Sequence, residues 1–315
     1  MKGISMSRIW ESLFSKNGLA AREIAKKILL LDEGGRIPKV SDLAQELGIG
    51  NGTVQGALKV LEKLHAIKLD ARGHLGTFLR KKDTILLKEI AGVGKLVGAM
   101  PLPYSAMYEG LATGIIEVSE TIVNNIDLVY MRGSKQRLES LKARRSDFVV
   151  MSQLAAETEV DQEDNLEIIV NFGANTYVST HQVFFSNKQH TKIEDGMRIG
   201  IDYTSVDQSQ LTLLECEGYT VSFVPVNYMQ LFDMLLNEHI DAAVWNADEN
   251  RSKETFTTGE FQSHKASALA LKASTAVILV EKDREDVHSA IKELDKDRIL
   301  EIQQKVINKE KLPHY

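Results

Sequence analysis

The arrangement of apolar and polar positions divides the chain into two parts that meet near residue 82. In the first part, apolar residues recur every three or four positions, which is the spacing of one face of an amphipathic helix. Four helices are expected there, and two short strands joined by a turn follow them. The helices are predicted at residues 7–16, 19–32, 40–47 and 51–64, the strands at 67–70 and 75–80, and the turn at 71–74.

The second part, residues 83–315, alternates short apolar runs with helical stretches, which is typical of a βα arrangement. The expected fold class is therefore α/β, preceded by a smaller α+β domain over residues 1–82, with Lys81–Asp83 as the linker. Strands are predicted at residues 96–100, 127–131, 147–152, 167–172, 177–185, 198–202, 220–226, 241–246 and 276–281. Helices are predicted at residues 106–120, 135–144, 205–217, 228–238 and 285–309.

The segment ELGIGNGTVQGALKVLEKL, residues 46–64, has four glycines within a helical pattern, although glycine costs about 1 kcal/mol relative to alanine in a helix interior. Helices followed by a two-stranded hairpin are the plan of a winged helix-turn-helix. We expect a positive φ at Gly48, in the turn, and a helix start capped at Gly50–Asn51. Gly52 and Gly56 are expected to face away from the apolar side, so that backbone amides approach a phosphate. The alternative is that these glycines only mark a frayed helix start.

The outer face of this helix offers groups that suit duplex DNA. The side-chain amides of Asn and Gln pair best with adenine edges, and basic residues along the helix and at the hairpin tip suit phosphates. The residues predicted to contact DNA are Asn51, Gly52, Thr53, Gln55, Gly56, Lys59, Lys63, Arg72 and His74.

The charge is unevenly distributed along the chain. Residues 1–82 hold 15 Lys and Arg against 8 Asp and Glu, a net charge of +7, whereas residues 83–315 hold 23 against 36, a net charge of −13. This asymmetry indicates that only the N-terminal part meets a polyanion such as DNA, although small basic domains also arise by chance. Because operator half-sites mirror protein symmetry, we expect a homodimer.

The segment RIPKVSDLAQELGIGNGTVQGALKVLEKLHAI, followed by GHLGTFL, resembles the DNA-binding domain of GntR-type regulators over residues 19–80. The matching positions are Pro38, Leu43, Ala44, Leu47, Thr53, Val54, Ala57, Leu58, Leu61, Gly73, Gly76, Thr77 and Phe78. That family usually has Ser–Arg where this chain has Gly50–Asn51, and Arg where it has Gln55. Because an Arg paired with guanine is the commonest specific base contact, the usual operator of that family is not expected here.

The order of elements in the second part resembles the type II periplasmic-binding-protein fold, in which two lobes flank a cleft, as in the sensor half of LysR-type regulators. The segments AMPLPYSAMYEGL, RGSKQRLESLKARRSDFVVMSQLAA, NTYVSTHQVFF, GMRIGIDYTSVDQ and DAAVWNADE, with the N-terminal domain, resemble the YhfZ-like regulators across nearly the whole chain. This resemblance implies a two-lobed effector domain over residues 83–315 in a ligand-responsive transcriptional regulator.

Short polar clusters follow most predicted strands of the second part. In open α/β sheets, ligands bind outside the carboxyl ends of the strands, and helix N-termini favour anionic groups. A small anionic, polar or zwitterionic metabolite would suit such a cleft, although the same residue types are also common helix caps and turn formers. The residues predicted to bind it are Tyr104, Ser105, Arg132, Ser134, Ser152, Gln153, Asn175, Thr176, Tyr177, Asp202, Thr204, Ser205, Asn227 and Asn246.

No metal or cofactor motif is recognisable: the eight histidines lack metal-ligand spacing, and there is no GxGxxG and no P-loop. The single cysteine, Cys216, fits a reducing compartment. No apolar run reaches the roughly 18 residues that cross a bilayer, and no secretory signal is seen, so we expect a cytoplasmic protein with no membrane contact and no cofactor. The alternatives to a regulator are an enzyme in the two-lobed body and a metabolite-binding protein that does not bind DNA.

Overall fold

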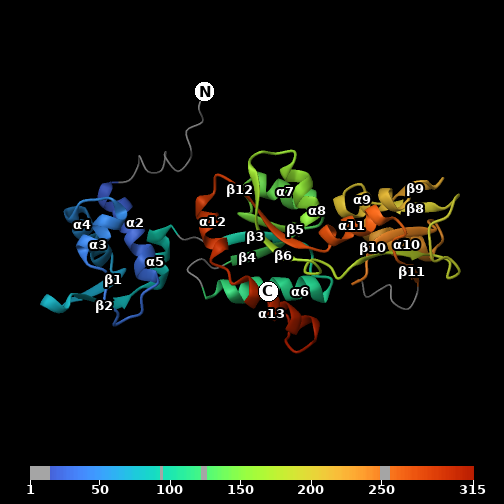
Figure 1. The fold of residues 1–315 in the computed structure, drawn as a ribbon. Helices are drawn as coiled ribbons and strands as arrows, with labels where there is room; N and C mark the ends of the chain where they lie inside the picture. Colours follow the sequence, from blue (N-terminus) through green and yellow to red (C-terminus); the bar gives the residue numbers. More distant parts are fainter. Residues whose placement is uncertain (1–14, 93–94, 122–125, 249–255) are drawn as a thin grey trace, which may run out of the picture. The chain divides into compact units, whose positions relative to one another are not determined.

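The computed structural model describes residues 15–92, 95–121, 126–248 and 256–315 (Figure 1). The chain forms two compact units, Met1–Lys95 and Leu96–Tyr315. Most of the helix predicted at residues 7–16 lies outside the described residues. In the part of the chain that the structure covers, every helix is too short or too polar to cross a membrane.

The first unit consists of short helices and one antiparallel hairpin. Its elements are α2 (Lys16–Leu29), α3 (Val40–Leu47), α4 (Asn51–Lys63), β1 (Ile67–Ala71), a 3-10 turn (Gly73–Leu75), β2 (Thr77–Lys82) and α5 (Thr84–Ala91). Ile24, Leu43 and Leu61 bring the apolar faces of α2, α3 and α4 into one core, where each is at most 1% exposed. β1 pairs antiparallel with β2, with Leu69 opposite Leu79. The predicted winged helix-turn-helix is confirmed.

Helix α5 does not follow from the sequence pattern, which places a linker at its start. Asp83 instead caps α5 through its side chain, and Arg22 of α2 donates a hydrogen bond of 3.2 Å to the carbonyl of Ala91. The first compact unit therefore includes α5 and extends to Lys95. A helix of eight residues that follows a charged run has too few turns to show a clear period.

The second unit has two lobes, each built on a five-stranded sheet. The sheet of the first lobe has the order β4-β3-β5-β12-β6; β3 is parallel to β4 and β5, and β12 is antiparallel to both of its neighbours. Its strands are β3 (Leu96–Met100), β4 (Ile126–Tyr130), β5 (Phe148–Ser152), β6 (Leu166–Gly173) and β12 (Ala276–Glu281). Its helices are α6 (Ala106–Ser119), α7 (Ser134–Lys142), α8 (Gln153–Val160), α12 (Glu285–Lys292) and α13 (Lys296–Ile307).

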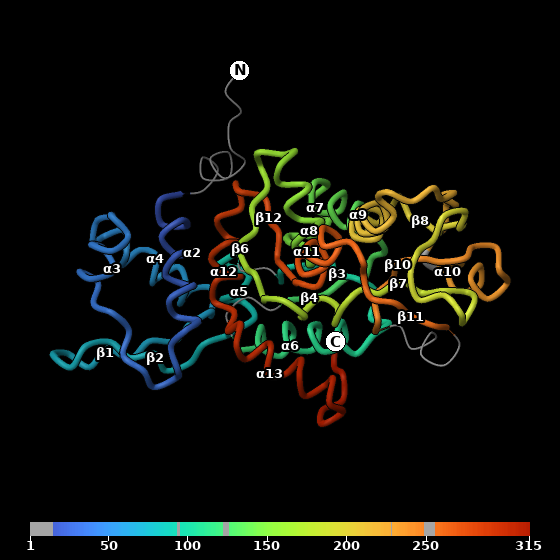
Figure 2. The backbone as a smooth tube through the Cα atoms, turned by 45° about the vertical axis from the view of Figure 1, so that its right-hand side comes forward, coloured from blue at the N-terminus to red at the C-terminus, as the bar shows by residue number. Residues whose placement is uncertain are grey.

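Helices cover both faces of this sheet. α7 and α8 lie on one face, and α6 and α13 lie side by side on the other (Figure 2). Alternate residues of β5 enter the two cores, since Val149 and Met151 pack with α7 and α8, and Phe148 and Val150 pack with α6 and α13. A strand buried on both faces is apolar throughout, which explains why β5 is a continuous apolar run in the sequence.

The second lobe has the sheet order β11-β7-β10-β8-β9, in which β8 is parallel to β9 and β10, and β7 is antiparallel to β10 and β11. Its strands are β7 (His181–Phe185), β8 (Arg198–Ile201), β9 (Ser222–Pro225), β10 (Ala242–Asn246) and β11 (Thr257–Gly259). Its helices are α9 (Val206–Glu215), α10 (Tyr228–Leu236) and α11 (His264–Ala273).

The two lobes follow one plan. Each lobe has three parallel strands, in the order β4-β3-β5 in the first lobe and β9-β8-β10 in the second. The third of these strands pairs with a strand that the chain reaches by crossing from the other lobe, β12 in the first lobe and β7 in the second. The two crossings are the segments 174–180, before β7, and 274–275, before β12. They lie side by side, and the amides of Thr176 and Tyr177 donate hydrogen bonds of 3.0 and 2.9 Å to the carbonyl of Ser274. The expected two-lobed, type II periplasmic-binding-protein-like α/β fold is confirmed, and the crossings form its hinge.

Several elements of the second unit differ from the sequence prediction. β7 starts at His181 rather than residue 177, because Tyr177 belongs to the crossing. The single helix predicted over residues 285–309 is two helices, α12 and α13, since Asp295 caps a new helix start through a hydrogen bond from Arg298 N (3.0 Å). The predicted pattern also lacks α8, which follows directly on β5, as well as β11 and α11.

Candidate functional site

The turn between α3 and α4 contains the first of the predicted special glycines. Gly48 ends α3 in the left-handed region, with φ of 64°, as expected. Gly50 is the N-cap of α4, with φ of −75° and ψ of 148°, and has no side chain to bond the first turn. Asn51 is therefore the first helical residue and not the cap, which corrects the expectation and leaves its amide on the exposed end of the helix.

The outer face of α4 carries most of the predicted DNA contacts. Asn51, Gln55, Lys59 and Lys63 are exposed, Gly52 is exposed, and Thr53 is half-buried. A Cβ at Gly52 would meet no atom within 4 Å, so this part of the face is open to an approaching partner.

Gly56 differs from the other glycines of α4. A Cβ at Gly56 would lie 2.9 Å from Nδ2 of Asn17, at the start of α2, so Gly56 is half-buried beneath that side chain. Gly56 faces the polar side chain of Asn17, and its lack of a side chain makes room for the start of α2.

Of the two residues of the hairpin tip that are predicted to contact DNA, Arg72 is held in place by neighbouring side chains. Both Arg72 and His74 are exposed. Arg72 donates through Nε to Asp70 at 2.9 Å, and its guanidinium lies 4.5 Å from the centre of the Phe78 ring. These contacts restrict the orientation of Arg72 and partly offset its charge.

A groove of about 510 Å³ lies between α4 and the hairpin. Gln55 and Lys59 line it from α4, and the exposed Arg36 and Lys39, which precede α3, line it from the other side. Sequence reasoning missed Arg36 and Lys39, although the charged RIPK segment next to the predicted helix signals them.

In the second unit, a cavity of about 120 Å³ lies between the lobes and next to the hinge. The carboxyl ends of parallel strands from both sheets meet there, which is where open α/β sheets bind ligands. Nine of the residues predicted to bind a metabolite line it: Tyr104, Arg132, Ser134, Ser152, Tyr177, Asp202, Thr204, Ser205 and Asn246.

The other five predicted residues do not line this cavity, and each has a capping, turn or side-chain contact within the protein. Ser105 caps α6 and Asn227 caps α10. Gln153 donates to Glu157, Asn175 takes a φ of 59° in the hinge, and Thr176 donates to the carbonyl of Gly173. Ser, Thr and Asn next to a helix have the same appearance in sequence whether they cap the helix or contact a ligand.

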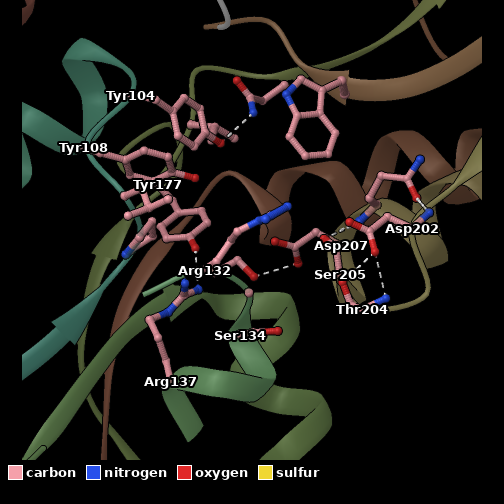
Figure 3. Close-up of a pocket in the computed structure, with 18 of the residues that line it drawn as sticks. Tyr104, Tyr108, Arg132, Ser134, Arg137, Tyr177, Asp202, Thr204, Ser205 and Asp207 are labelled. Carbon is pink, nitrogen blue, oxygen red and sulfur yellow. Dashed lines mark hydrogen bonds between the residues drawn. The ribbon is translucent and has the colours of Figure 1, made fainter. Parts of the chain in front are cut away.

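The wall contributed by the first lobe starts at the N-terminus of α7 (Figure 3). Gly133, with φ of 69°, is its N-cap, and no side chain caps the first turn. Ser134 is 8% exposed and Arg132 is exposed, and both line the cavity. An N-terminus of this kind, beside an arginine, favours an anionic group.

Arg137 lies one turn further along α7 and is 3% exposed. It donates to the carbonyl of Met131 and to the hydroxyl of Tyr177, both at 3.0 Å, and its Nε has no hydrogen-bond partner. Tyr177 packs edge-to-face against Tyr108, at 5.0 Å between ring centres. Burial raises the pKa of both tyrosines, so both stay protonated. Sequence reasoning missed Arg137, and its i, i+3 spacing from Ser134 is the signal that indicates it.

The wall contributed by the second lobe is acidic. Asp202 is 6% exposed and accepts two hydrogen bonds at Oδ1 from Thr204, 2.9 Å from its amide and 2.6 Å from its hydroxyl. Asp207, on α9, accepts a hydrogen bond of 2.6 Å from Ser152 of the first lobe. Burial raises the pKa of Asp207 to about 6, against the opposing effects of the Ser152 hydroxyl and the Arg137 charge. Sequence reasoning did not single out Asp207.

Two further residues complete the cavity near the hinge. Asn246 of β10 donates a hydrogen bond of 3.1 Å to the hydroxyl of Tyr104, which also joins the two lobes. His181, at the start of β7, is 9% exposed, and its Nδ1 has no hydrogen-bond partner. Burial lowers the pKa of His181 to about 4, so it is neutral at pH 7.

The remaining chemistry-bearing residues lie apart from this cavity. Asp147 pairs with Arg284 at 2.8 Å, and Asp241 pairs with Arg198 at 2.6 Å. Cys216 is buried, which raises the pKa of its thiol to about 12. Among the residues that the structure describes, no group of three or more His, Cys, Asp or Glu is placed to hold a metal ion.

Comparison with known families agrees with both units. A family model described as the YhfZ C-terminal domain matches residues 83–315, and one described as a helix-turn-helix domain matches residues 32–79. Neither description is that of an enzyme family.

Three relatives support this assignment. The uncharacterized protein YhfZ of Escherichia coli is 30% identical over 307 residues, which cover 96% of this chain and 99% of that protein. A crystal structure of YhfZ from Shigella flexneri matches with a TM-score of 0.60 and 29% identity, covering 74% of this chain and 97% of that one. An HTH-type transcriptional regulator of Mycobacterium tuberculosis is 36% identical over 74 residues, 22% of this chain and 60% of that protein. The chain therefore belongs to the YhfZ family, with a helix-turn-helix domain followed by the YhfZ C-terminal domain.

Proposed function

We propose that this protein is a DNA-binding transcriptional regulator whose two-lobed body binds a small polar or anionic effector. The observation that carries the proposal is the combination, in one chain, of a helix-turn-helix with an open polar face and a cavity lined by buried charged groups. The match of the N-terminal unit to an HTH-type transcriptional regulator supports it.

The exposed residues of α4 have two different roles in DNA binding, contact with base edges and contact with phosphates. Gln55 lies at the groove next to the hairpin, and its side-chain amide suits a base edge. Lys63, in the last turn, suits a phosphate, which carries no sequence information. The bare surface at Gly52 lets the helix approach the DNA backbone closely.

The cavity supports effector binding because it buries charged groups that a folded chain otherwise avoids. Asp202 and Arg137 are both more than nine-tenths buried at its surface. Burying such groups is unfavourable unless they are paired or are used by a ligand. Closure of the lobes around an effector would change the affinity of the first unit for DNA, as a coupling of typically about 1–3 kcal/mol.

The regulator acts as a homodimer, because one winged helix-turn-helix covers only a half-site.

The test uses duplexes from the region upstream of the coding sequence and measures binding of the full chain by fluorescence anisotropy. Gln55→Ala is expected to change the preference among duplex sequences, whereas Lys63→Ala is expected to weaken binding of all duplexes alike. Lys292→Ala, an exposed lysine of α12 in the second unit, is the control and should change neither. Uniform weakening by both α4 variants would show that α4 is not the recognition helix.

An enzyme in the two-lobed body is the second candidate, favoured by one observation. Asp207 has a pKa of about 6 within a cleft, which is a property of general acids and bases. Its hydrogen-bond partner there is the Ser152 hydroxyl, which also caps α8 through the amide of Ala155 at 3.1 Å. A turnover assay with small metabolites separates this candidate from a pure binding role.

A further inference from the structure

The cavity between the lobes has walls of opposite charge. The first lobe contributes the N-terminus of α7, with Arg132 and Arg137, and the second lobe contributes Asp202 and Asp207 (Figure 3). We infer that the effector is a compact zwitterion, with a carboxylate that binds the α7 wall and an ammonium group that binds the two aspartates. This inference rests on the proposed function, since it names the chemical class of the ligand at that site.

Donors dominate the α7 wall. No side chain caps the first turn of α7, so its amides lack an internal acceptor. Arg137 lies on the same side of the helix as Ser134, and its buried Nε lacks a partner. His181, on β7 of the second lobe, is also more than nine-tenths buried at the cavity and keeps an unpartnered Nδ1. Two unpartnered buried nitrogens at one cavity indicate that its polar atoms are arranged for a ligand or for water that a ligand displaces.

Acceptors dominate the opposite wall. Asp202 uses Oδ1 for both bonds from Thr204, and Asp207 uses Oδ1 for the bond from Ser152. Within the described part of the chain, the Oδ2 atom of each aspartate accepts no hydrogen bond. Two carboxylate oxygens left over at one wall suit an ammonium group, which has three donors and no acceptor.

Other ligand classes leave one wall unsatisfied. A simple anion would satisfy α7 but would face the like charge of Asp202 and Asp207. A simple cation would face Arg132 and Arg137, and a neutral polyol would bring no charge to either wall. The cavity of about 120 Å³ lies below the roughly 300–1,000 Å³ of pockets for drug-sized ligands. The two charges of the ligand are therefore only a few bonds apart.

The test is a thermal-shift screen of the full chain at millimolar ligand concentration, followed by calorimetric titration. The probes are the common L-amino acids, β-alanine and 4-aminobutyrate, each with the matched hydroxy or unsubstituted acid that lacks the amine and the matched amine that lacks the carboxylate. Glycerol, inositol and succinate are included to represent polyols and dicarboxylates. We expect at least one zwitterion to raise Tm, and both of its matched partners to shift Tm less.

Substitutions at aspartates test which side chain binds the ammonium group of the ligand. Asp202→Asn is expected to weaken binding of the zwitterion by about tenfold or more, as for loss of a charged hydrogen bond, and to leave binding of the matched acid nearly unchanged. Asp233→Asn makes the same change of charge on the exposed surface of α10 and should leave both affinities unchanged. Equal loss of zwitterion and acid binding in Asp202→Asn would overturn the assignment of the ammonium group.

The screen also separates this inference from the proposed function. A polyol, a dicarboxylate or a plain acid that raises Tm at least as much as every zwitterion overturns the inference, and the proposed function stands if that ligand also changes DNA affinity. If no probe of any class changes Tm, both the zwitterion and the effector-binding role of the cavity are contradicted.

Discussion

The hydroxyl of Ser152, at the end of β5 in the first lobe, donates a hydrogen bond of 2.6 Å to the carboxylate of Asp207 on α9 in the second lobe. Ser152 is fully buried, and the same hydroxyl oxygen caps α8. The Ser152 hydroxyl therefore both caps α8 and forms a hydrogen bond between the two lobes. Any separation of the lobes at this point would break the hydrogen bond that lowers the pKa of Asp207.

Ser152→Ala is expected to destabilise the chain by more than an ordinary helix cap does. Loss of a Ser cap costs about 1 kcal/mol, and this variant also removes the donor that lowers the pKa of Asp207. We expect a larger fall in the free energy of unfolding than in Ser263→Ala, which removes the cap of α11 outside the cavity, and an Asp207 pKa above 6 by NMR titration. Equal losses in the two variants, with unchanged titration of Asp207, would contradict the role of the link.

The pH dependence of stability is expected to reflect two buried groups with opposite signs. The pKa of Asp207 is raised from 3.8 to about 6, so between these values the folded chain holds a proton that the unfolded chain releases, and stability falls as pH rises. The pKa of His181 is lowered from 6.5 to about 4, so there the unfolded chain holds the proton and stability rises with pH.

Asp207→Asn removes the contribution of Asp207 to the pH dependence of stability and leaves that of His181. We expect Tm of this variant to rise more steeply than that of the wild type between pH 4 and pH 6.5, in scanning calorimetry across that range. The exposed Asp233→Asn should keep the wild-type slope. Parallel curves for Asp207→Asn and the wild type would mean that Asp207 ionises normally in the folded chain.

Tyr177→Phe is expected to destabilise the hinge side of the cavity. The change leaves a buried nitrogen of Arg137 without its acceptor, at a cost of about 1–3 kcal/mol. Tyr203→Phe, which alters a tyrosine that is 55% exposed, should stay within about 0.5 kcal/mol of the wild type in urea unfolding. A similarly small effect of Tyr177→Phe would show that Arg137 does not depend on this bond.

Gly52→Ala is expected to stabilise the first unit and weaken DNA binding. The site has open space for a methyl group, and alanine gains up to about 1 kcal/mol over glycine in a helix. The added methyl group would occupy the surface that is proposed to approach the DNA backbone. Gly56→Ala requires Asn17 to move and should gain less stability. Thermal unfolding and anisotropy on the same samples measure both effects, and unchanged DNA affinity in Gly52→Ala would remove the functional reason for this glycine.

Local signals in the sequence are sufficient for much of the fold. The periodicity of α2, α3 and α4 and the apolar strands of the two sheets are properties of short windows, which is why the winged helix-turn-helix and the α/β body are predictable. Helix α5 and strand β11 are not, because they are too short to show a period and are stabilised by packing against distant segments.

The site depends on contacts between residues far apart in sequence. Arg137 reads as part of a basic, solvated helix, and only its bonds to Met131 and Tyr177 bury it. The pKa of Asp207 follows from burial and from Ser152, which is 55 residues away. Ser105 and Asn227 cap helices outside the cavity, and a residue before a helix has the same sequence signature whether it caps the helix or binds a ligand.

The proposed function depends on binding of duplex DNA by α4 and the hairpin of the first unit. The most direct measurement is fluorescence anisotropy of the full chain on upstream duplexes across a series of salt concentrations, with and without metabolites. Because lysine and arginine displace counterions from DNA, log affinity should fall linearly with log salt, by about tenfold or more between 50 and 200 mM. Absence of binding to every duplex at the lowest salt, both with and without metabolites, would contradict the proposed DNA binding by the first unit.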